Sequence, residues 1–393
     1  MENKMTYDFV TAPDRRNVGA SKWIDMAEKI PEAGEGIVPL SVADMEFENP
    51  PEIIEGLKEY LDHAVLGYTE ATQSYYDSVI SWMQHRHGFT PKKEWFVMTA
   101  GVVPAVKEMV ANFTKPGDSV LMLTPVYYPF YSCVEANQRT VVGSELILDD
   151  SGYSIDFTDF EEKASRPEVT LFILCSPHNP IGRIWTKEEL EKLFEICYRN
   201  HVFVISDEIH FDLIMPGYTH ISAGVLDEKY LDNCAICTAP SKTFNLAGLQ
   251  TSNIFIPNAE YREKMTAARG YFALNIFGYK ACELAYNCCE KWLDELLLVL
   301  DENRKAVEDY IAENMPEVKV QRLEGTYLMW LDFRAWKMTA KELEDFMLHK
   351  AFVAFDEGYV FGKGGEGFER MNIACPKHIL LEALERIAKA HRA

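Results

Sequence analysis

Short apolar runs that alternate with helical segments are the feature that most constrains the fold of this sequence. Largely apolar runs occur at 120–123, 169–175, 202–205 and 234–237, and each is too short for a typical helix. Segments with helical periodicity, such as 187–200, separate several of them. Because neighbouring parallel strands are joined by helical crossovers, the pattern predicts an α/β fold with a mainly parallel sheet covered by helices on both faces.

A polar residue suited to chemistry follows each of these runs. Tyr127, Asn179, Asp207 and Lys242 lie within a few residues of the four run ends. In sheets of this kind, ligands bind outside the carboxyl ends of the strands. We therefore expect the four side chains to line one shared site.

Lys242 and Asp207 are the pair that one cofactor requires. Pyridoxal 5'-phosphate (PLP) needs an amine that forms an imine with its aldehyde and a carboxylate that keeps its ring nitrogen protonated. Taken alone, Lys242 could be a solvated surface lysine, and Asp207 could be a helix N-cap. Asn179, between two prolines that stiffen its turn, could be an ordinary turn residue. Their combination at strand ends favours a PLP site.

The other parts of PLP also have candidate partners. Gly101 and Pro104 open a predicted helix, where backbone N–H groups can approach a phosphate. Tyr127 or Tyr128 could cover the ring, although aromatic residues near strand ends usually belong to the core. The sequence thus offers a candidate for each contact that PLP needs.

The chain is long enough for two domains, and its pattern changes near residue 286. A chain of 393 residues exceeds the usual size of a single core. We expect an extended N-terminal arm at 1–46 that associates with the small domain, a large PLP-binding domain at 47–285 and a small α+β domain at 286–393. In the small domain, strands are predicted at 352–355 and 370–374, among others.

Charge and cysteine content restrict the partners and the compartment. A net charge of −22 disfavours nucleic acid and anionic membranes as partners. No run approaches the roughly 20 apolar residues of a membrane span, and the N-terminus lacks an apolar signal region. Nine cysteines, an odd number, fit free thiols in a reducing, cytoplasmic environment. Cys234 and Cys237 form a Cys-x-x-Cys inside a predicted strand, away from a helix N-terminus, so we assign them no redox role.

Motifs for other ligands lack the necessary context. Residues 362–367 match Gly-x-Gly-x-x-Gly but precede a predicted strand, so dinucleotide binding is not expected. His85 and His87 lack the i, i+4 spacing of a helical metal pair, and we predict no metal site. For His178, beside Asn179, a structural role and a contact with substrate both stay open.

Four motifs together resemble a known family. They are Ser-Pro-His-Asn-Pro-Ile-Gly at 176–182, Ser-Asp-Glu-Ile-His at 206–210, Ala-Pro-Ser-Lys-Thr-Phe-Asn at 239–245 and Arg-Met-Asn-Ile-Ala-Cys-Pro at 370–376. In this order they resemble fold type I PLP enzymes of the aspartate aminotransferase superfamily. This resemblance implies a large domain with a mainly parallel, seven-stranded-type sheet sandwiched by helices and a smaller α+β C-terminal domain. More closely, the chain is similar to the MalY/PatB branch of cystathionine β-lyases over essentially its whole length.

The resemblance implies a role for each matching position. Lys242 would be the catalytic residue and would hold PLP as an imine, and Asp207 would pair with the ring nitrogen. The other implied cofactor contacts are Asn179 and His210 at the phenolic oxygen, Tyr127 on the ring, Gly101, Val102, Val103 and Ser241 at the phosphate, and Tyr68 at the phosphate of the neighbouring subunit of a homodimer. Arg370 would bind the substrate α-carboxylate, with Asn179 and Asp44 also near the substrate.

Three positions depart from the aminotransferase pattern. His210 and Gln250 stand where aminotransferases usually carry Tyr and a phosphate-binding Arg, and both departures resemble the lyase branch. Ala239 stands where a phosphate-binding Ser is common, with Thr238 as a candidate substitute.

The resemblance implies a carbon–sulfur β-lyase acting on a small sulfur amino acid such as L-cystathionine. One alternative is an aminotransferase that uses the same lysine and then accepts a keto acid. Another is a regulatory binding protein that retains PLP and acts through a partner surface.

Overall fold

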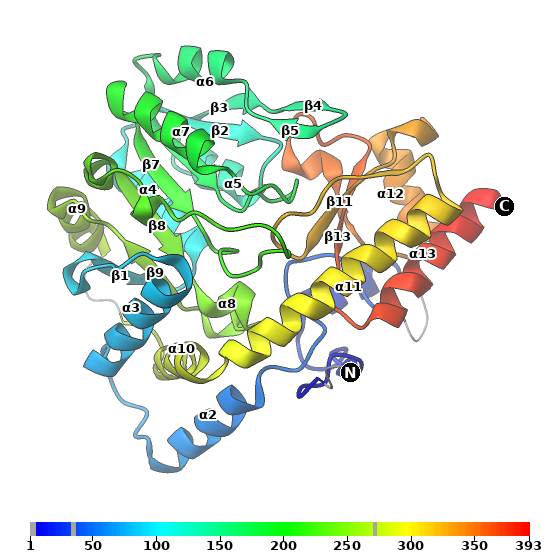
Figure 1. Cartoon of the computed structure of the whole chain (residues 1–393), viewed down its shortest axis with the longest axis horizontal. Coiled ribbons are helices and arrows are strands. Elements are labelled where there is room, and N and C mark those ends of the chain that lie inside the picture. Colours follow the sequence, from blue (N-terminus) through cyan, green and yellow to red (C-terminus); the bar gives the residue numbers. More distant parts are fainter. Residues whose placement is uncertain (1–4, 33–36, 270–272) are drawn as a thin grey trace.

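The computed structural model describes residues 5–32, 37–269 and 273–393, which are built around two sheets (Figure 1). The larger sheet has the strand order β1-β9-β8-β7-β6-β2-β3. Its strands are β1 (Phe96–Thr99), β2 (Ser119–Thr124), β3 (Thr140–Glu145), β6 (Val169–Cys175), β7 (Phe203–Asp207), β8 (Cys234–Thr238) and β9 (Ser252–Phe255). The predicted α/β fold with a seven-stranded, mainly parallel sheet is confirmed.

Strand β9 is antiparallel to both of its neighbours, β1 and β8, and the sequence pattern did not predict it. Two of its four residues, Ser252 and Asn253, are polar, which hides the strand from a hydrophobic pattern. Both are buried and satisfied by side chains: Ser252 Oγ lies 2.5 Å from Thr99 Oγ1, and Tyr75 donates a hydrogen bond of 2.6 Å to Asn253 Oδ1. Tertiary hydrogen bonds thus compensate for the weak local signal.

Alternate residues of each buried strand pack against helices on opposite faces of the sheet. In β2, Val120 and Met122 join one apolar cluster, whereas Leu121 and Leu123 join the other. The helices that contribute to the first cluster are α4 (Val102–Phe113), α5 (Pro129–Glu135) and α9 (Ala259–Arg269). Those that contribute to the second include α3 (Gln73–His87), α6 (Phe157–Ala164), α7 (Lys187–Arg199) and α10 (Ile276–Cys288).

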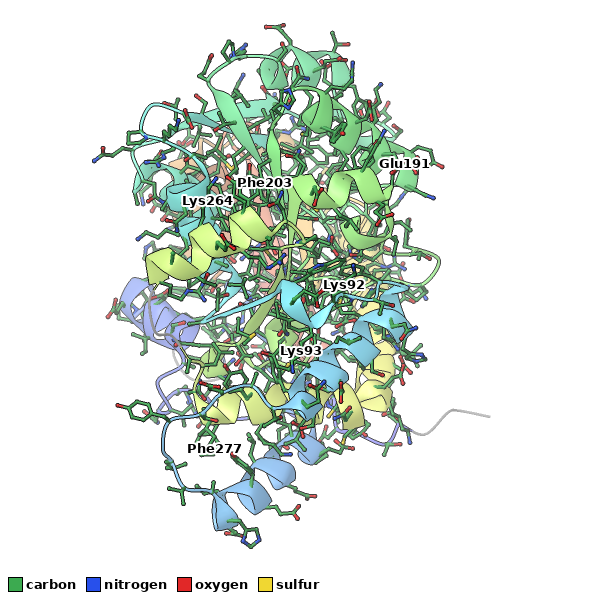
Figure 2. The ribbon with its side chains drawn as sticks, turned by 90° about the vertical axis from the view of Figure 1, so that its left-hand side faces the viewer. Lys92, Lys93, Glu191, Phe203, Lys264 and Phe277 are labelled. Atoms are coloured by element: carbon green, nitrogen blue, oxygen red, sulfur yellow. The ribbon has the colours of Figure 1, made fainter. Side chains whose placement is uncertain are left out.

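Figure 2 views this arrangement from the side that carries β1 and β9. Lys264 of α9 and Glu191 of α7 lie on opposite sides of Phe203, which belongs to the central strand β7. Phe203 itself is buried. The sheet is therefore covered on both faces, as the predicted sandwich requires.

The C-terminal part of the chain forms a four-stranded antiparallel sheet with its own helices. The sheet order is β10-β11-β13-β12, and the strands are β10 (Lys319–Val320), β11 (Leu328–Asp332), β12 (Asp356–Glu357) and β13 (Phe368–Asn372). The long helix α11 (Glu290–Asn314) packs along α13 (Lys377–Arg392), and α12 (Ala340–His349) lies nearby in Figure 1. Remaining elements are α2 (Pro51–His63), the short helix α8 (Pro240–Thr243) and the hairpin β4 (Ile147–Asp149) to β5 (Gly152–Ser154).

Two predictions about local structure were wrong. The strand predicted at 352–355 is irregular, and pairing with β13 begins only at Asp356. Phe352 has a φ of +53°, which no strand accommodates, and the carbonyl of Ala354 accepts a hydrogen bond from Leu40 N instead of a strand partner. The N-terminal arm is also not wholly extended, because its described residues include helix α1 (Ser21–Lys29).

Helix α1 packs against residues of the C-terminal part. Trp23 and Met26 form a small apolar cluster with Leu348 and Ala354. This contact supports the predicted association of the arm with the small domain, whereas the proposed bounds at 46 and 285 stay a prediction. Among the described residues, no helix is long and apolar enough to cross a membrane.

The buried Asn303 yields a test of this architecture. It lies on α11 and donates hydrogen bonds of 2.9 and 2.8 Å to the carbonyls of Ile373 and Cys375, just after β13. Asn303→Ala leaves two buried carbonyls unpaired, so we expect the free energy of unfolding to fall by about 2–3 kcal/mol. Urea unfolding would measure this. Glu313→Ala, an exposed position on the same helix, should change the free energy of unfolding by less than about 0.5 kcal/mol. Equal losses in the two variants would contradict the assigned role of Asn303.

Candidate active site

The carboxyl ends of β1, β2, β6, β7 and β8 open into one cavity of about 160 Å³. Each strand leads directly to a residue on the cavity wall, as expected for a sheet of this topology. The predicted site residues that line it are Gly101, Val102, Val103, Tyr127, Asn179, Asp207, His210, Ser241 and Lys242. The structure therefore brings together residues that span more than a third of the sequence.

Lys242 projects into this cavity from α8, the single turn that follows β8. Its Nζ donates a hydrogen bond of 2.7 Å to the backbone carbonyl of Ala43. Burial, followed by the positive charge of Arg370, lowers the pKa of Lys242 to about 8, although nearby carboxylates oppose the shift. An amine with this pKa is partly neutral near pH 7, which both imine formation and proton abstraction require.

Asp207, the last residue of β7, lies buried on the cavity wall. Its Oδ1 accepts a hydrogen bond of 3.0 Å from the backbone N–H of Ile209. Burial raises the pKa of Asp207 to about 7, and the neighbouring charge of Lys242 only partly offsets this. Among the described residues, no cation lies within ion-pair distance of this carboxylate. A protonated pyridine nitrogen would supply the missing partner.

Two buried nitrogen atoms in the site also lack partners among the described residues. They are Nδ1 of His210 and Nε of Arg370. Burial and the charges of Lys242 and Arg370 hold the pKa of His210 well below its usual range, so its ring is neutral. Buried polar groups in folded proteins are normally hydrogen-bonded, so these atoms are expected to bind a ligand. The donor set fits the phenolic oxygen of PLP and a substrate carboxylate.

The N-terminus of α4 is suited to a phosphate. Gly101 precedes the helix with a φ of +131°, a conformation that side-chain-bearing residues rarely adopt. The first N–H groups of a helix have no partner within it and carry a partial positive charge, and here they begin at the cavity wall. Ser241 lies nearby on the same wall. Thr238 does not, because its hydroxyl donates to the carbonyl of Asn253 within the sheet.

Arg370 is held beside the cavity by two partners. Its Nη1 donates a hydrogen bond of 3.0 Å to Asn179 Oδ1, and its Nη2 lies 2.5 Å from Asp356 Oδ2. The guanidinium also lies over the ring of Phe361, 4.9 Å from its centre. Arg370 is almost completely buried, so a carboxylate that reaches it would be recognised away from water. Sequence reasoning did not identify Asp356, because no local pattern marks a lone acidic residue that becomes buried.

Three predicted residues are placed differently from the rest. Tyr68 follows α2 and does not line the cavity of its own chain; it is 98% exposed. The carboxylate of Asp44 is engaged in ion pairs with Arg15 at 2.7 Å and Lys22 at 2.8 Å, which does not support a direct role in substrate binding. Nε2 of His178 lies 2.8 Å from the carbonyl of Pro125, and burial lowers the pKa of this histidine to about 4. His178 is therefore structural.

A buried network behind α8 fixes the turn that carries Lys242. The hydroxyl of Thr243 donates a hydrogen bond of 2.8 Å to Asp212, which also accepts from Trp82 Nε1 and lies 2.8 Å from His87 Nε2. Asp212 is completely buried in this network. None of these residues carried a functional signal in the sequence, because they touch the lysine's neighbour instead of the cavity.

Comparison with known proteins decides the family. The family model described as aminotransferase class I and II matches residues 35–387. The chain belongs to this family. Cystathionine beta-lyase PatB of Bacillus subtilis is 44% identical over 90% of this chain and 92% of its own length. Protein MalY of Escherichia coli is 31% identical over 98% of this chain and 99% of its own. The predicted likeness to the MalY/PatB branch is confirmed.

Solved structures agree with this assignment. Cystalysin from Treponema denticola, whose structure contains PLP, is 49% identical with a TM-score of 0.97, and the match covers 99% of both chains. The PLP-bound C-S lyase from Staphylococcus hominis is 32% identical with a TM-score of 0.91, over 98% of both chains. The fold of this family member is therefore the type I fold that the motifs implied.

The raised pKa of Asp207 predicts a pH-dependent stability in the chain without cofactor. Between about pH 4 and pH 7 the folded chain retains a proton that the unfolded chain has released, so stability falls as the pH rises. We expect Asp207→Asn to increase the free energy of unfolding at pH 8, by at most about 4 kcal/mol, and by much less at pH 5. Urea unfolding at both pH values, with the exposed variant Asp150→Asn as control, measures this. A gain that is equal at the two pH values would contradict it.

Proposed function

We propose that this chain is a PLP-dependent carbon–sulfur β-lyase that cleaves L-cystathionine and related cysteine S-conjugates. The observation that carries the proposal is that Lys242 and Asp207 line one cavity, with Arg370 beside it and hydrogen-bonded to Asn179 of the cavity wall. These residues match the needs of PLP chemistry on an α-amino acid. The names of the relatives, cystathionine beta-lyase and C-S lyase, support the choice of reaction within the family.

The residues that would hold PLP follow from the cavity. Lys242 would bond to its aldehyde, Asp207 would face its ring nitrogen, and the start of α4 at 101–103 with Ser241 would bind its phosphate. Asn179 and His210 would contact the phenolic oxygen, and Tyr127 would cover the ring. When bound, PLP supplies an electron sink for the negative charge that develops at the substrate α-carbon.

The residues of the chain provide positioning and proton transfer. Arg370, held by Asn179 and Asp356, would bind the substrate α-carboxylate and orient the α-carbon toward Lys242. With a pKa of about 8, the Lys242 amine is suited to remove the α-proton and to hold it. Loss of the thiolate from the β-carbon needs little acid assistance, since thiols are good leaving groups. Addition of water then gives pyruvate and ammonia, so cystathionine and water yield homocysteine, pyruvate and ammonia.

The decisive experiment is a product assay without added keto acid. We expect the chain loaded with PLP to release pyruvate and thiol from L-cystathionine, and Lys242→Ala to lower kcat by at least about 10³-fold because the base is lost. Lys264→Ala, on the exposed side of α9, is the matched control and should keep the activity. Reduction with borohydride should attach the cofactor to the peptide that contains Lys242.

Other outcomes of this assay identify the rival functions. Turnover that depends strictly on an added keto acid would make the chain an aminotransferase and would overturn the lyase proposal. A biological function that survives Lys242→Ala would indicate a role as a PLP-containing binding protein. A chain that stays colourless after incubation with PLP would remove the basis of the proposal altogether.

We also propose that the active form is a homodimer with shared sites. Helix α2 buries Ile53 and packs Leu57 partly against the core, whereas several other apolar side chains of the helix and of the segment that follows are exposed. These exposed side chains are Ile54, Leu61, Val65, Leu66 and Tyr68. Figure 1 shows that α2 lies at the margin of the molecule. A second copy that covers this face would bury the apolar surface and would bring Tyr68 to the partner's phosphate site.

A complementation experiment tests this arrangement. Lys242→Ala and Tyr68→Ala are each expected to be nearly inactive as pure proteins. Dissociated and reassembled together, they should form hybrids in which one site has both Lys242 and the Tyr68 of the other chain, so activity should return to roughly a quarter of the wild-type value. Titration of one variant with the other measures the gain. No gain on mixing would show that Tyr68 acts within its own chain or not at all.

A further inference from the structure

Residues 42–45, which we call the 42–45 strap, reach the wall of the cavity at Ala43. Ala43 lines the cavity, and its carbonyl accepts hydrogen bonds from Lys242 Nζ at 2.7 Å and from Tyr327 Oη at 2.9 Å. Nδ2 of Asn372 donates hydrogen bonds of 2.7 Å to the carbonyls of Val42 and Asp44. The strap is thus the point at which the N-terminal arm meets the proposed base.

A buried ion cluster holds the strap from its outer side. Nζ of Lys22 lies 2.8 Å from Asp44 Oδ1 and 3.0 Å from Glu46 Oε1. Arg15 binds the same two carboxylates at 2.7 and 2.6 Å, and Trp23 Nε1 donates a hydrogen bond to Glu46. The side chains of Lys22 and Glu46 are each only 1% exposed. Such complete burial of opposite charges is uncommon in folded proteins and needs a compensating geometry.

The strap contains a backbone conformation that is unfavourable for its own residues. Val42 has a φ of +52°, a region that β-branched residues rarely enter because of steric strain. Its N–H donates a hydrogen bond of 2.9 Å to Asp356, the residue that also binds Arg370. A strained segment of this kind persists only where the surrounding contacts impose it.

We propose that Lys22 and Glu46 are positioning residues whose buried ion pair fixes the Ala43 carbonyl against the Lys242 amine. They touch neither the cavity nor the proposed cofactor, and they act through the backbone of the strap. The inference deepens the proposed function, on which it rests for the role of Lys242 as the base. It assigns to the N-terminal arm a part in the chemistry that its place in the sequence does not suggest.

The strap also sets the environment in which Lys242 titrates. The charged groups that face this amine are Arg370 from β13, Asp44 from the strap, Asp207 from β7 and Asp356 from β12. Burial has the largest effect on the pKa of Lys242 and lowers it to about 8. Loosening the strap would admit water, and the pKa would rise toward the usual value of about 10.4.

Competitive labelling of the full-length chain without cofactor measures this directly. An amine-reactive reagent applied at a series of pH values, with the Lys242 peptide quantified by mass spectrometry, gives the pH midpoint and the limiting reactivity of Lys242. For Lys22→Met and for the charge-neutral double variant Lys22→Met/Glu46→Gln, we expect the midpoint to rise by about one unit. Lys29→Met, on the same helix and also ion-paired, should leave it unchanged.

The design separates positioning from simpler roles. A purely structural role would lower the thermal midpoint of the variants without moving the titration of Lys242, and that outcome overturns the proposal. A purely electrostatic role would shift the pH midpoint of Lys242 in Lys22→Met and leave it unchanged in the double variant. That outcome also overturns the proposal. If Lys22→Met does not fold, Trp23→Phe, which removes only the hydrogen bond to Glu46, should raise the pH midpoint of Lys242 by a smaller amount. Lys22→Arg, which keeps the positive charge, should retain the wild-type midpoint.

The proposed function and this inference fail in different ways. In the chain loaded with PLP, the acidic limb of the kcat profile should move to higher pH in Lys22→Met, in parallel with the labelling midpoint. If the wild-type chain shows no lyase activity, the proposed function fails while the labelling result still decides whether the ion pair positions Lys242. If activity is present and neither profile moves, the inference alone is wrong.

Discussion

The hydrogen bond between Lys242 and the carbonyl of Ala43 joins two parts of the chain that are 199 residues apart, and the organisation of the site depends on it. A buried amine needs an acceptor, since an unpaired buried donor is costly. Here the acceptor is a backbone atom, so its position is set by whatever holds the strap. The chemistry of the sheet is thereby tied to the N-terminal arm and to the C-terminal sheet.

Three ionisable groups, those of Lys242, Asp207 and Arg370, lie close together at this site without direct ion pairs between them. Burial moves the pKa of Lys242 down and that of Asp207 up, so both groups change protonation near neutral pH. Asp356 and Asn179 hold the Arg370 guanidinium in place by hydrogen bonds. These groups are stabilised most by a ligand that brings a cationic ring nitrogen and a carboxylate. This is the physical reason that the site suits an amino acid bound to PLP.

Much of this fold and site could be predicted from the sequence, because the signals were local. The strand at 169–175 and helix 187–199 match their predicted ranges to within a residue, since an apolar run marks the strand and helical periodicity marks the helix. Lys242, Asp207 and Asn179 were recognised because each follows a strand. Residues whose role depends on distant contacts carried no such signal. The polar residues of strand β9 are hydrogen-bonded by side chains of other elements, and the positive φ of Phe352 interrupts an apparent strand. Asp356 becomes important only where it binds the strap beside β13.

The threading of the strap between the two sheets has a consequence for biosynthesis. Val42, at the start of the strap, precedes its anchor Asn372 by 330 residues and is therefore synthesised long before it. All strands of the seven-stranded sheet precede β13 in the chain, so the acceptor of Lys242 is not anchored by Asn372 until β13 has been made. A chain that stops before β13 would therefore contain Lys242 and the large sheet but would lack both Arg370 and the anchor of the strap.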